Sequence, residues 1–225
     1  MNMNGTPLAP EPTSTGPDME LEHRRAAIAA LGHELRTLVD ATVRTEAAPD
    51  TLHGVAAGVR GLVARLTGRR RTRAEIPDVD EFPGGTRMNS PVTGTGSPVA
   101  PPLRVTPSDD DGVVGRCVLG IAHEGPPGYG HGGFSAMLLD ELMGWACAAE
   151  GTPAMTVSLQ LGYRGPVPLE TPLLVRAGVT ARENRTLHVT GSIATEADPT
   201  RPLVTGEAVF VTPNPDHARN LFPGM

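Results

Sequence analysis

One stretch of the chain, residues 123–141, most constrains what it can fold into. Its sequence is His-Glu-Gly-Pro-Pro-Gly-Tyr-Gly-His-Gly-Gly-Phe-Ser-Ala-Met-Leu-Leu-Asp-Glu, a glycine-rich turn that leads into an apolar segment carrying a carboxylate. Glycine lets the backbone approach a ligand closely, and the first N–H groups of a helix have no partner within it. Such a turn can bind an oxyanion or polarise a carbonyl. Asp140, nine residues after His131, could supply general-base chemistry, so the stretch predicts hydrolysis.

The residues around this stretch predict one long helix and a set of antiparallel strands. Residues 131–149 are apolar almost all round and are expected to form the helix. Strand-like segments, separated by turn-rich breaks, are expected at 113–121, 154–163, 171–182, 186–196 and 203–212. The order predicts an α+β fold in which an antiparallel sheet wraps around the long central helix.

The first part of the chain predicts a separate helical unit. Residues 1–17 are rich in Pro, Thr and Gly and are expected to form a disordered tail. Apolar residues then recur every three or four positions on either side of Pro49-Asp50, which predicts an N-terminal helical hairpin over residues 18–76. Asp18 is expected to cap its first helix. The apolar stripe needs a partner, which we expect to be the main domain or a second subunit rather than a membrane.

A linker is expected between the hairpin and the main domain. Residues 77–96 are rich in Pro, Gly, Ser and Asp, which is typical of irregular structure. The main domain is expected to span residues 97–225, with one short strand near Leu103.

Composition excludes several classes of protein. The net charge is −6, so the overall balance shows no nucleic-acid footprint, and the 19 basic residues are all arginine, which excludes Schiff-base lysines and a P-loop lysine. Cys117 and Cys147 are too few for a disulfide framework, and the seven histidines lack metal-ligand spacing, so no metal is expected. Because neither a signal peptide nor a run of about 18 apolar residues occurs, a cytoplasmic location is expected.

The glycine spacing also matches a dinucleotide-binding fingerprint, so a dinucleotide site has to be considered. Gly128-x-Gly130-x-x-Gly133 precedes a helix, as that motif requires. The motif belongs in a βαβ unit with an acid near the end of the second strand. Here the next strand ends in Leu161-Gly162-Tyr163 without an acid, and no crossover helices follow, so a dinucleotide site is excluded.

Three polar side chains on the predicted helix have different expected roles. Ser135 does not lie in a nucleophile-elbow pattern and is expected to be a hydroxyl on the helix surface. Asp140 and Glu141 are adjacent and so do not share a helix face. The face of Asp140 carries small residues that leave room for a ligand or a second chain, whereas Glu141 lies with Met137 and Trp145 and is expected to be structural. The small residues are Gly133, Ala136, Gly144 and Cys147.

These residues resemble the signature of the PaaI-like acyl-CoA thioesterases, which have the hotdog fold. The resemblance rests on His131-Gly132-Gly133 with Asp140 behind it. The upstream Glu124-Gly-Pro-Pro-Gly-Tyr and the downstream Met155-Thr156 and Tyr163–Leu169 segments are similar to the THEM-type branch. The resemblance covers roughly residues 97–213. It implies hydrolysis of acyl-CoA or acyl-carrier-protein thioesters without a cofactor.

The resemblance also implies roles for individual residues. The backbone N–H of Gly132, aided by Gly133, would polarise the thioester carbonyl at the helix N-terminus. Asp140 would activate water or attack directly, and the Thr156 hydroxyl would position the carboxylate or the water. His131 is expected to shape the turn.

Substrate contacts are expected from three further places. Arg164 would meet a CoA phosphate, although Gly165 replaces the second basic residue of the related pattern. Glu124 and His123 occupy the region where many relatives place an Asn or Gln as a polarising contact. Arg69, Arg70, Arg71 and Arg73 form either a solvated surface beside the negative end of a helix or a contact with CoA phosphates or an acidic carrier.

Helix geometry predicts a homodimer or higher homo-oligomer. Gly132 and Asp140 are eight residues apart, so about 12 Å separates them along one helix, too far for both to act on one carbon. We therefore expect Gly132 of one subunit to face Asp140 of its neighbour. Two alternatives remain open: a non-hydrolytic acyl-thioester binding module, and a hydratase-type lyase, which would need a different Asp/His pair that the sequence does not offer.

Overall fold

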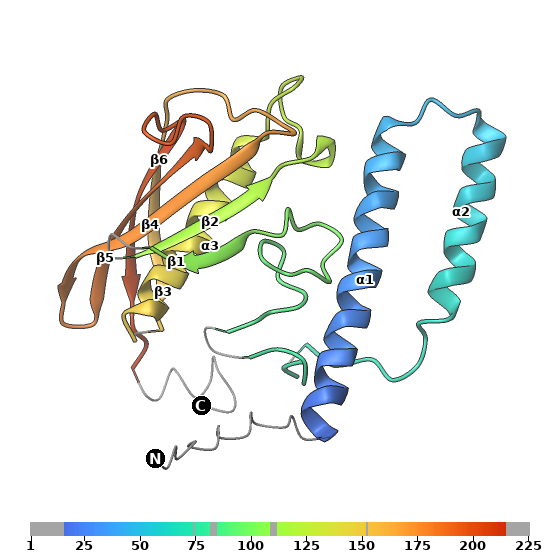
Figure 1. The fold of residues 1–225 in the computed structure, drawn as a ribbon, viewed down its shortest axis with the longest axis horizontal. Coiled ribbons are helices and arrows are strands. Elements are labelled where there is room, and N and C mark those ends of the chain that lie inside the picture. The colour runs from blue at the N-terminus through green and yellow to red at the C-terminus, as the bar shows by residue number, and fades with distance from the viewer. Residues whose placement is uncertain (1–15, 74, 82–84, 109–111, 152, 215–225) are drawn as a thin grey trace, which may run out of the picture.

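The structure is a computed structural model that describes residues 16–73, 75–81, 85–108, 112–151 and 153–214. The predicted disordered tail, residues 1–17, lies outside these ranges except for residues 16 and 17, which begin the first helix. Two N-terminal helices lie beside a curved sheet that wraps around a third helix (Figure 1). The elements are α1 (Gly16–Arg44), α2 (Pro49–Ala64), β1 (Arg104–Pro107), β2 (Val113–Val118), α3 (Gly132–Ala149), β3 (Met155–Tyr163), β4 (Pro172–Glu183), β5 (Thr186–Thr195) and β6 (Val204–Val211).

The sheet is antiparallel throughout, in the order β1-β2-β4-β5-β6-β3. This confirms the predicted α+β class and the hotdog arrangement of a sheet around one long helix. The short strand expected near Leu103 is β1, which pairs with β2. β2 differs most from its predicted length: it ends at Val118 rather than at residue 121, because residues Ile121–His123 form a 3-10 turn, whereas each bound of the other predicted strands is within one residue of the prediction.

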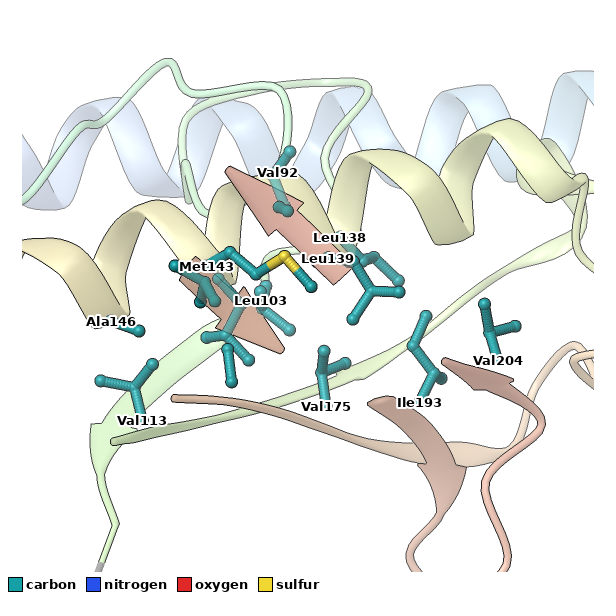
Figure 2. Packing of buried hydrophobic residues seen from close by; sticks show 14 of the residues in the cluster. Val92, Leu103, Val113, Leu138, Leu139, Met143, Ala146, Val175, Ile193 and Val204 are labelled. Carbon is teal, nitrogen blue, oxygen red and sulfur yellow. The ribbon is translucent and has the colours of Figure 1, made fainter. Parts of the chain in front are cut away.

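The core forms where α3 lies in the concave face of the sheet (Figure 2). Leu138, Leu139 and Met143 of α3 are completely buried against β4, β5 and β6. Two glycines paired across β5 and β6 allow this close approach, because a Cβ built at either Gly191 or Gly206 would lie 3.0 Å from Met143 Cε. Burial of these apolar side chains holds α3, and with it the glycine-rich turn, in a fixed position on the sheet.

The N-terminal helices behave differently from each other. α1 lies against the body: Arg36 donates hydrogen bonds to the carbonyl oxygens of Thr95 (2.7 Å) and Ser97 (2.8 Å). α2 follows as the second arm of the predicted hairpin (Figure 1), but none of its residues is buried. Asp18 is not the N-cap that was expected, since α1 begins at Gly16 and places Asp18 in its first turn. Among the described helices, none is both long and apolar enough to span a membrane.

The segment expected as a linker, residues 77–96, is packed against the domain. Val79, Met88 and Val92 are buried within it, and Val92 belongs to the main core cluster. The Leu103 N–H donates to the Val92 carbonyl (2.9 Å), which ties the segment to the start of β1. The segment therefore contributes Val92 to the hotdog core, and the division of the chain into a hairpin, a linker and a main domain stays a prediction.

Candidate active site

The glycine-rich turn before α3 is closed by hydrogen bonds within itself. The Gly128 N–H donates to Glu124 Oε1 (2.8 Å), and the Gly125 N–H donates to the Tyr129 carbonyl (2.9 Å). Gly128 has a φ of 81°, which side chains rarely allow, so glycine is required there. The turn is anchored to the body because the Gly130 N–H donates to the Val167 carbonyl (2.8 Å). Glu124 thus braces this turn with Oε1, and its expected contact with substrate stays a prediction.

His131 caps α3 and selects which backbone donor stays free. Its Nδ1 accepts a hydrogen bond from the Gly133 N–H (3.0 Å). The expected contribution of Gly133 to carbonyl polarisation is therefore not available in this conformation. Within the described part of the chain the Gly132 N–H donates to no other group, so it is the donor left at the positive end of the helix dipole.

Tyr163, at the end of β3, contacts the same first turn of α3. Its hydroxyl donates to the Gly132 carbonyl (3.0 Å). A Cβ added at Gly132 would lie 3.2 Å from this hydroxyl, so glycine leaves room for the tyrosine. Sequence reasoning did not select Tyr163 as a site residue. The available signal was an aromatic residue at the exit of a predicted strand, directly before the basic Arg164.

Asp140 and Thr156 are brought together between the middle of α3 and the start of β3. The Thr156 hydroxyl donates to Asp140 Oδ1 at 2.7 Å, as the resemblance implied. Asp140 is half-buried and Thr156 is exposed, so the carboxylate keeps one side open to solvent. A carboxylate held by one hydroxyl, with a second oxygen available, can accept a proton from water or attack a carbonyl.

A β-bulge directs Thr156 toward α3. Thr156 pairs with Phe210 and Ser158 with Val209, so β3 carries one residue more than β6 at Val157. In a regular strand successive side chains alternate between faces, and Thr156 and Tyr163, seven positions apart, would point in opposite directions. The additional residue puts both side chains on the helix side of the sheet, where each contacts α3.

Of the other two polar residues of α3, Glu141 is half-buried and Ser135 is buried. Glu141 Oε1 accepts hydrogen bonds from Thr93 Oγ1 (3.3 Å) and Trp145 Nε1 (3.4 Å), which fits its expected structural role. Ser135 is only 2% exposed, so the expectation of a surface hydroxyl was wrong. The cause is that Ser135 lies one turn before Leu138 and Leu139 on the face that the sheet covers.

Comparison with known proteins identifies the family of this chain. The model of the thioesterase superfamily matches residues 127–201, which include Gly132, Asp140 and Thr156. The crystal structure of the thioesterase superfamily protein RHA08564 is 32% identical and has a TM-score of 0.73; the match covers 82% of this chain and 94% of that one. The chain belongs to the thioesterase superfamily.

Two curated relatives in this superfamily are similar over a shorter segment. They are the acyl-coenzyme A thioesterases THEM4 of Mus musculus and Rattus norvegicus, each 31% identical over 97 residues. The match covers 43% of this chain and 41% of each relative, so the chain spans about two fifths of the length of the curated relatives it matches.

The arginines expected to contact CoA phosphates lie in two places in this thioesterase superfamily member, at the end of β3 and after α2. Arg164 is exposed, and its guanidinium lies over Gly162 at the end of β3, one residue from the tyrosine that contacts Gly132. Arg69 pairs with Glu75 Oε1 (3.3 Å), and Arg71 donates to the Glu75 carbonyl (3.1 Å). Both are thus engaged locally, far along the chain from the turn. Among the described residues, no group of three His, Cys, Asp or Glu side chains could hold a metal ion.

The site of this superfamily member is divided into two halves, each formed by one contact between α3 and β3. One half combines the Gly132 N–H with Tyr163, and the other combines Asp140 with Thr156. Eight residues of α3 separate Gly132 from Asp140, or about 12 Å at the usual rise of a helix. β3 is an edge strand of the sheet, so both halves lie beside an open edge.

Proposed function

We propose that this protein hydrolyses acyl-CoA thioesters to the free acid and CoA. The observation that carries the proposal is the hydrogen bond from Thr156 of β3 to Asp140, which lies on the same helix as the free Gly132 N–H, within a superfamily member. The names of the THEM4 relatives support acyl-CoA as the substrate class, and an acyl-carrier protein is the alternative donor. The cytoplasmic location expected from the sequence stays a prediction.

The proposed chemistry uses each group for one task. The thioester carbonyl oxygen accepts a hydrogen bond from the Gly132 N–H, and the negative charge that develops on this oxygen is stabilised by the helix N-terminus. Asp140 accepts a proton from water that attacks the carbonyl carbon, or it attacks the carbonyl carbon directly to form a mixed anhydride that water then hydrolyses to the free acid. Thr156 holds Asp140 Oδ1 by a hydrogen bond, which leaves Oδ2 for the reaction. The thiolate of CoA leaves and takes a proton.

We infer a homodimer in which each reaction site uses both subunits. The unpaired backbone groups of an edge strand form a template for another strand, and on β3 the side chains of Met155, Val157 and Tyr163 are exposed. Antiparallel pairing of β3 with its copy about a two-fold axis near its middle would bring the Thr156 end against the partner subunit's Tyr163 end. This arrangement joins the two half-sites and removes the 12 Å separation.

Release of free thiol from a panel of acyl-CoAs tests the hydrolysis. The wild-type protein should release CoA, and Asp140→Asn should reduce kcat by about 10²–10⁴-fold because it removes the proton acceptor. Glu141→Gln is the matched control: it is the adjacent acid, held by Trp145, and should change kcat little. Burial raises the pKa of Cys117 to about 12 and of Cys147 to about 11, so the folded protein should add no thiol signal near neutral pH.

If thiol release stays at the background rate for every CoA and carrier-protein thioester, hydrolysis is rejected and a non-hydrolytic acyl-thioester binding module is favoured. Equal losses from Asp140→Asn and Glu141→Gln in folded proteins would contradict the separate roles of the two acids.

A complementation experiment tests the shared site. Asp140→Asn and Gly132→Val, each inactive alone, are unfolded and refolded together. Each mixed dimer has one site with intact Gly132 and intact Asp140, and random pairing makes about half of the dimers mixed, so about a quarter of the normal activity should return. If mixing is verified by mass and no activity returns, the shared-site proposal is wrong.

A further inference from the structure

A cavity of about 430 Å³ lies between α1 and the hotdog body. Its walls come from the middle of α1, from residues 98–102, from the end of β2 with the turn that follows, and from the first turn of α3. The volume falls within the range of about 300–1,000 Å³ that is usual for small-molecule pockets. The apolar lining includes Val39, Val99, Pro101, Val118, Ala122 and Phe134.

The lining is apolar and partly uncovered. Val99 is 57% exposed and Val118 is 46% exposed, although such side chains are usually buried. A ligand that covered them would remove this apolar surface from water.

The Arg36 and Asp40 side chains in the lining already have hydrogen-bond partners in the protein. Arg36 is engaged with the carbonyl oxygens of Thr95 and Ser97, and Asp40 pairs with Arg44 (2.8 Å). Arg36 and Asp40 also carry opposite charges and both line the cavity. The cavity therefore suits an uncharged apolar group better than the phosphates of CoA.

The cavity reaches the first turn of α3, where the Gly132 N–H lies. Phe134 lines it and follows Gly132 by two residues, about 3 Å of helix rise. The His123 ring, also in the lining, meets the Phe134 ring edge-on with centroids 4.7 Å apart. The His123 carbonyl accepts a hydrogen bond from the His131 N–H (2.9 Å). A residue of the cavity wall is therefore hydrogen-bonded directly to the residue that caps α3.

Most of the cavity lies outside the segment that defines the superfamily. The family model matches residues 127–201, and Phe134 alone among the lining residues falls within that range. The remaining wall is supplied by α1 and by residues 98–102 and 118–123. The α1 wall of this pocket is thus supplied by the N-terminal part of the chain, and the other walls belong to the hotdog body.

We infer that this cavity holds the acyl chain of the substrate, an apolar chain of medium length, and that α1 sets the chain-length preference. The inference rests on the proposed thioester hydrolysis, because it places the carbonyl at Gly132 and the chain behind Phe134. Each methylene that enters an apolar pocket should raise kcat/KM by about fourfold until the pocket is full.

The test fills the cavity from α1. Val39→Phe adds an aromatic ring to the lining, and Val43→Phe is the matched control, since Val43 lies one turn further along α1, is exposed and does not line the cavity. kcat/KM is measured for straight-chain acyl-CoAs from acetyl to palmitoyl. We expect Val39→Phe to shift the preferred length to shorter chains, with a loss of about tenfold or more on the best wild-type substrate. Acetyl-CoA turnover should fall much less than turnover of the long-chain substrates, and the whole Val43→Phe profile should be unchanged.

Ala122→Leu fills the cavity from the opposite wall and should shift the profile in the same direction, which guards against misfolding of one variant. Identical chain-length profiles in all four folded proteins would overturn the inference, while the hydrolysis itself would stand. If the wild type hydrolyses no thioester, the proposed function fails. Binding of the fluorescent fatty acid dansyl-aminoundecanoic acid then tests whether the cavity binds an acyl chain. Weaker binding in Val39→Phe than in Val43→Phe would then support an acyl-chain site, and equal binding would reject it.

Discussion

α2 and α3 are both apolar helices, of 16 and 18 residues, yet the molecule treats them in opposite ways. α3 lies in the concave face of the sheet and buries seven residues, whereas α2 lies beyond α1 and buries none (Figure 1). Leu62 of α2 is 54% exposed, and Leu142 of α3 is completely buried. An apolar stripe on a helix therefore indicates that the helix can pack against a partner. It does not indicate which of the helices packs against the sheet of the same chain.

The glycines of the N-terminal helices sharpen this contrast. Gly32 of α1 lies against the backbone of Thr95 and Gly96, and a Cβ there would come within 2.6 Å of Gly96 Cα. Gly58 of α2 has open space around the position of a Cβ. Close packing thus explains the glycine in α1, while nothing among the described residues explains the one in α2.

The largest effect is expected from removing both N-terminal helices. Deletion of residues 1–75 takes α1 away from residues 98–102 and uncovers apolar surface, so we expect aggregation or a changed oligomer in light scattering after gel filtration. A truncated protein that is monodisperse, unchanged in oligomeric state and equally active would show that the helices form an independent module.

The second prediction compares the replacement of one leucine in α3 with the replacement of one leucine in α2. Leu142→Ala should lower the free energy of unfolding by about 2–5 kcal/mol, because it leaves a cavity in a fully packed core. Leu62→Ala should change it by less than about 0.5 kcal/mol. Denaturant unfolding measures both, and similar losses for the two variants would mean that α2 is covered in solution.

A smaller loss is expected from Gly32→Ala in α1. The added methyl would meet the Thr95 and Gly96 backbone, and overpacking of this kind costs about 1–3 kcal/mol. Thermal unfolding of the variant beside the wild type tests this. An unchanged or higher Tm would show that α1 does not pack against residues 95–96 in solution.

The smallest effect is expected from Gly58→Ala in α2, and it has the opposite sign. With open space around the site, alanine should stabilise the helix by about 0.5–1 kcal/mol through its higher helix propensity. The same unfolding measurement decides. Destabilisation would indicate that another chain lies closely against α2.

The sequence predicted the secondary structure more fully than the packing. α3 and the strands follow from local signals, namely an apolar run after a glycine turn and β-branched segments between turn residues. The burial of Val79, Met88 and Val92 had no such signal, because they are isolated apolar residues without periodicity. The exposure of α2 was equally hidden, since its pattern matches that of a packed helix.

For the site, the motif predicted which residues matter but not how they are oriented. The contact between Asp140 and Thr156 agrees with the resemblance. The hydrogen bond from the Gly133 N–H to His131 Nδ1, which occupies that N–H, appears only in the geometry of the cap. Ser135 was misplaced because a nearly all-apolar helix gives little indication of which face the sheet covers.

The bulge at Val157 has a consequence for how this strand tolerates change. Whether Thr156 reaches Asp140 depends on the number of residues between it and Tyr163 as well as on their identity. A substitution at Val157, which is 61% exposed, should leave the arrangement intact, whereas loss of that one residue would turn Thr156 to the opposite face. In this strand, insertions and deletions are therefore far more dangerous than replacements, and a gap of one position in an alignment would mark a relative with a different active site.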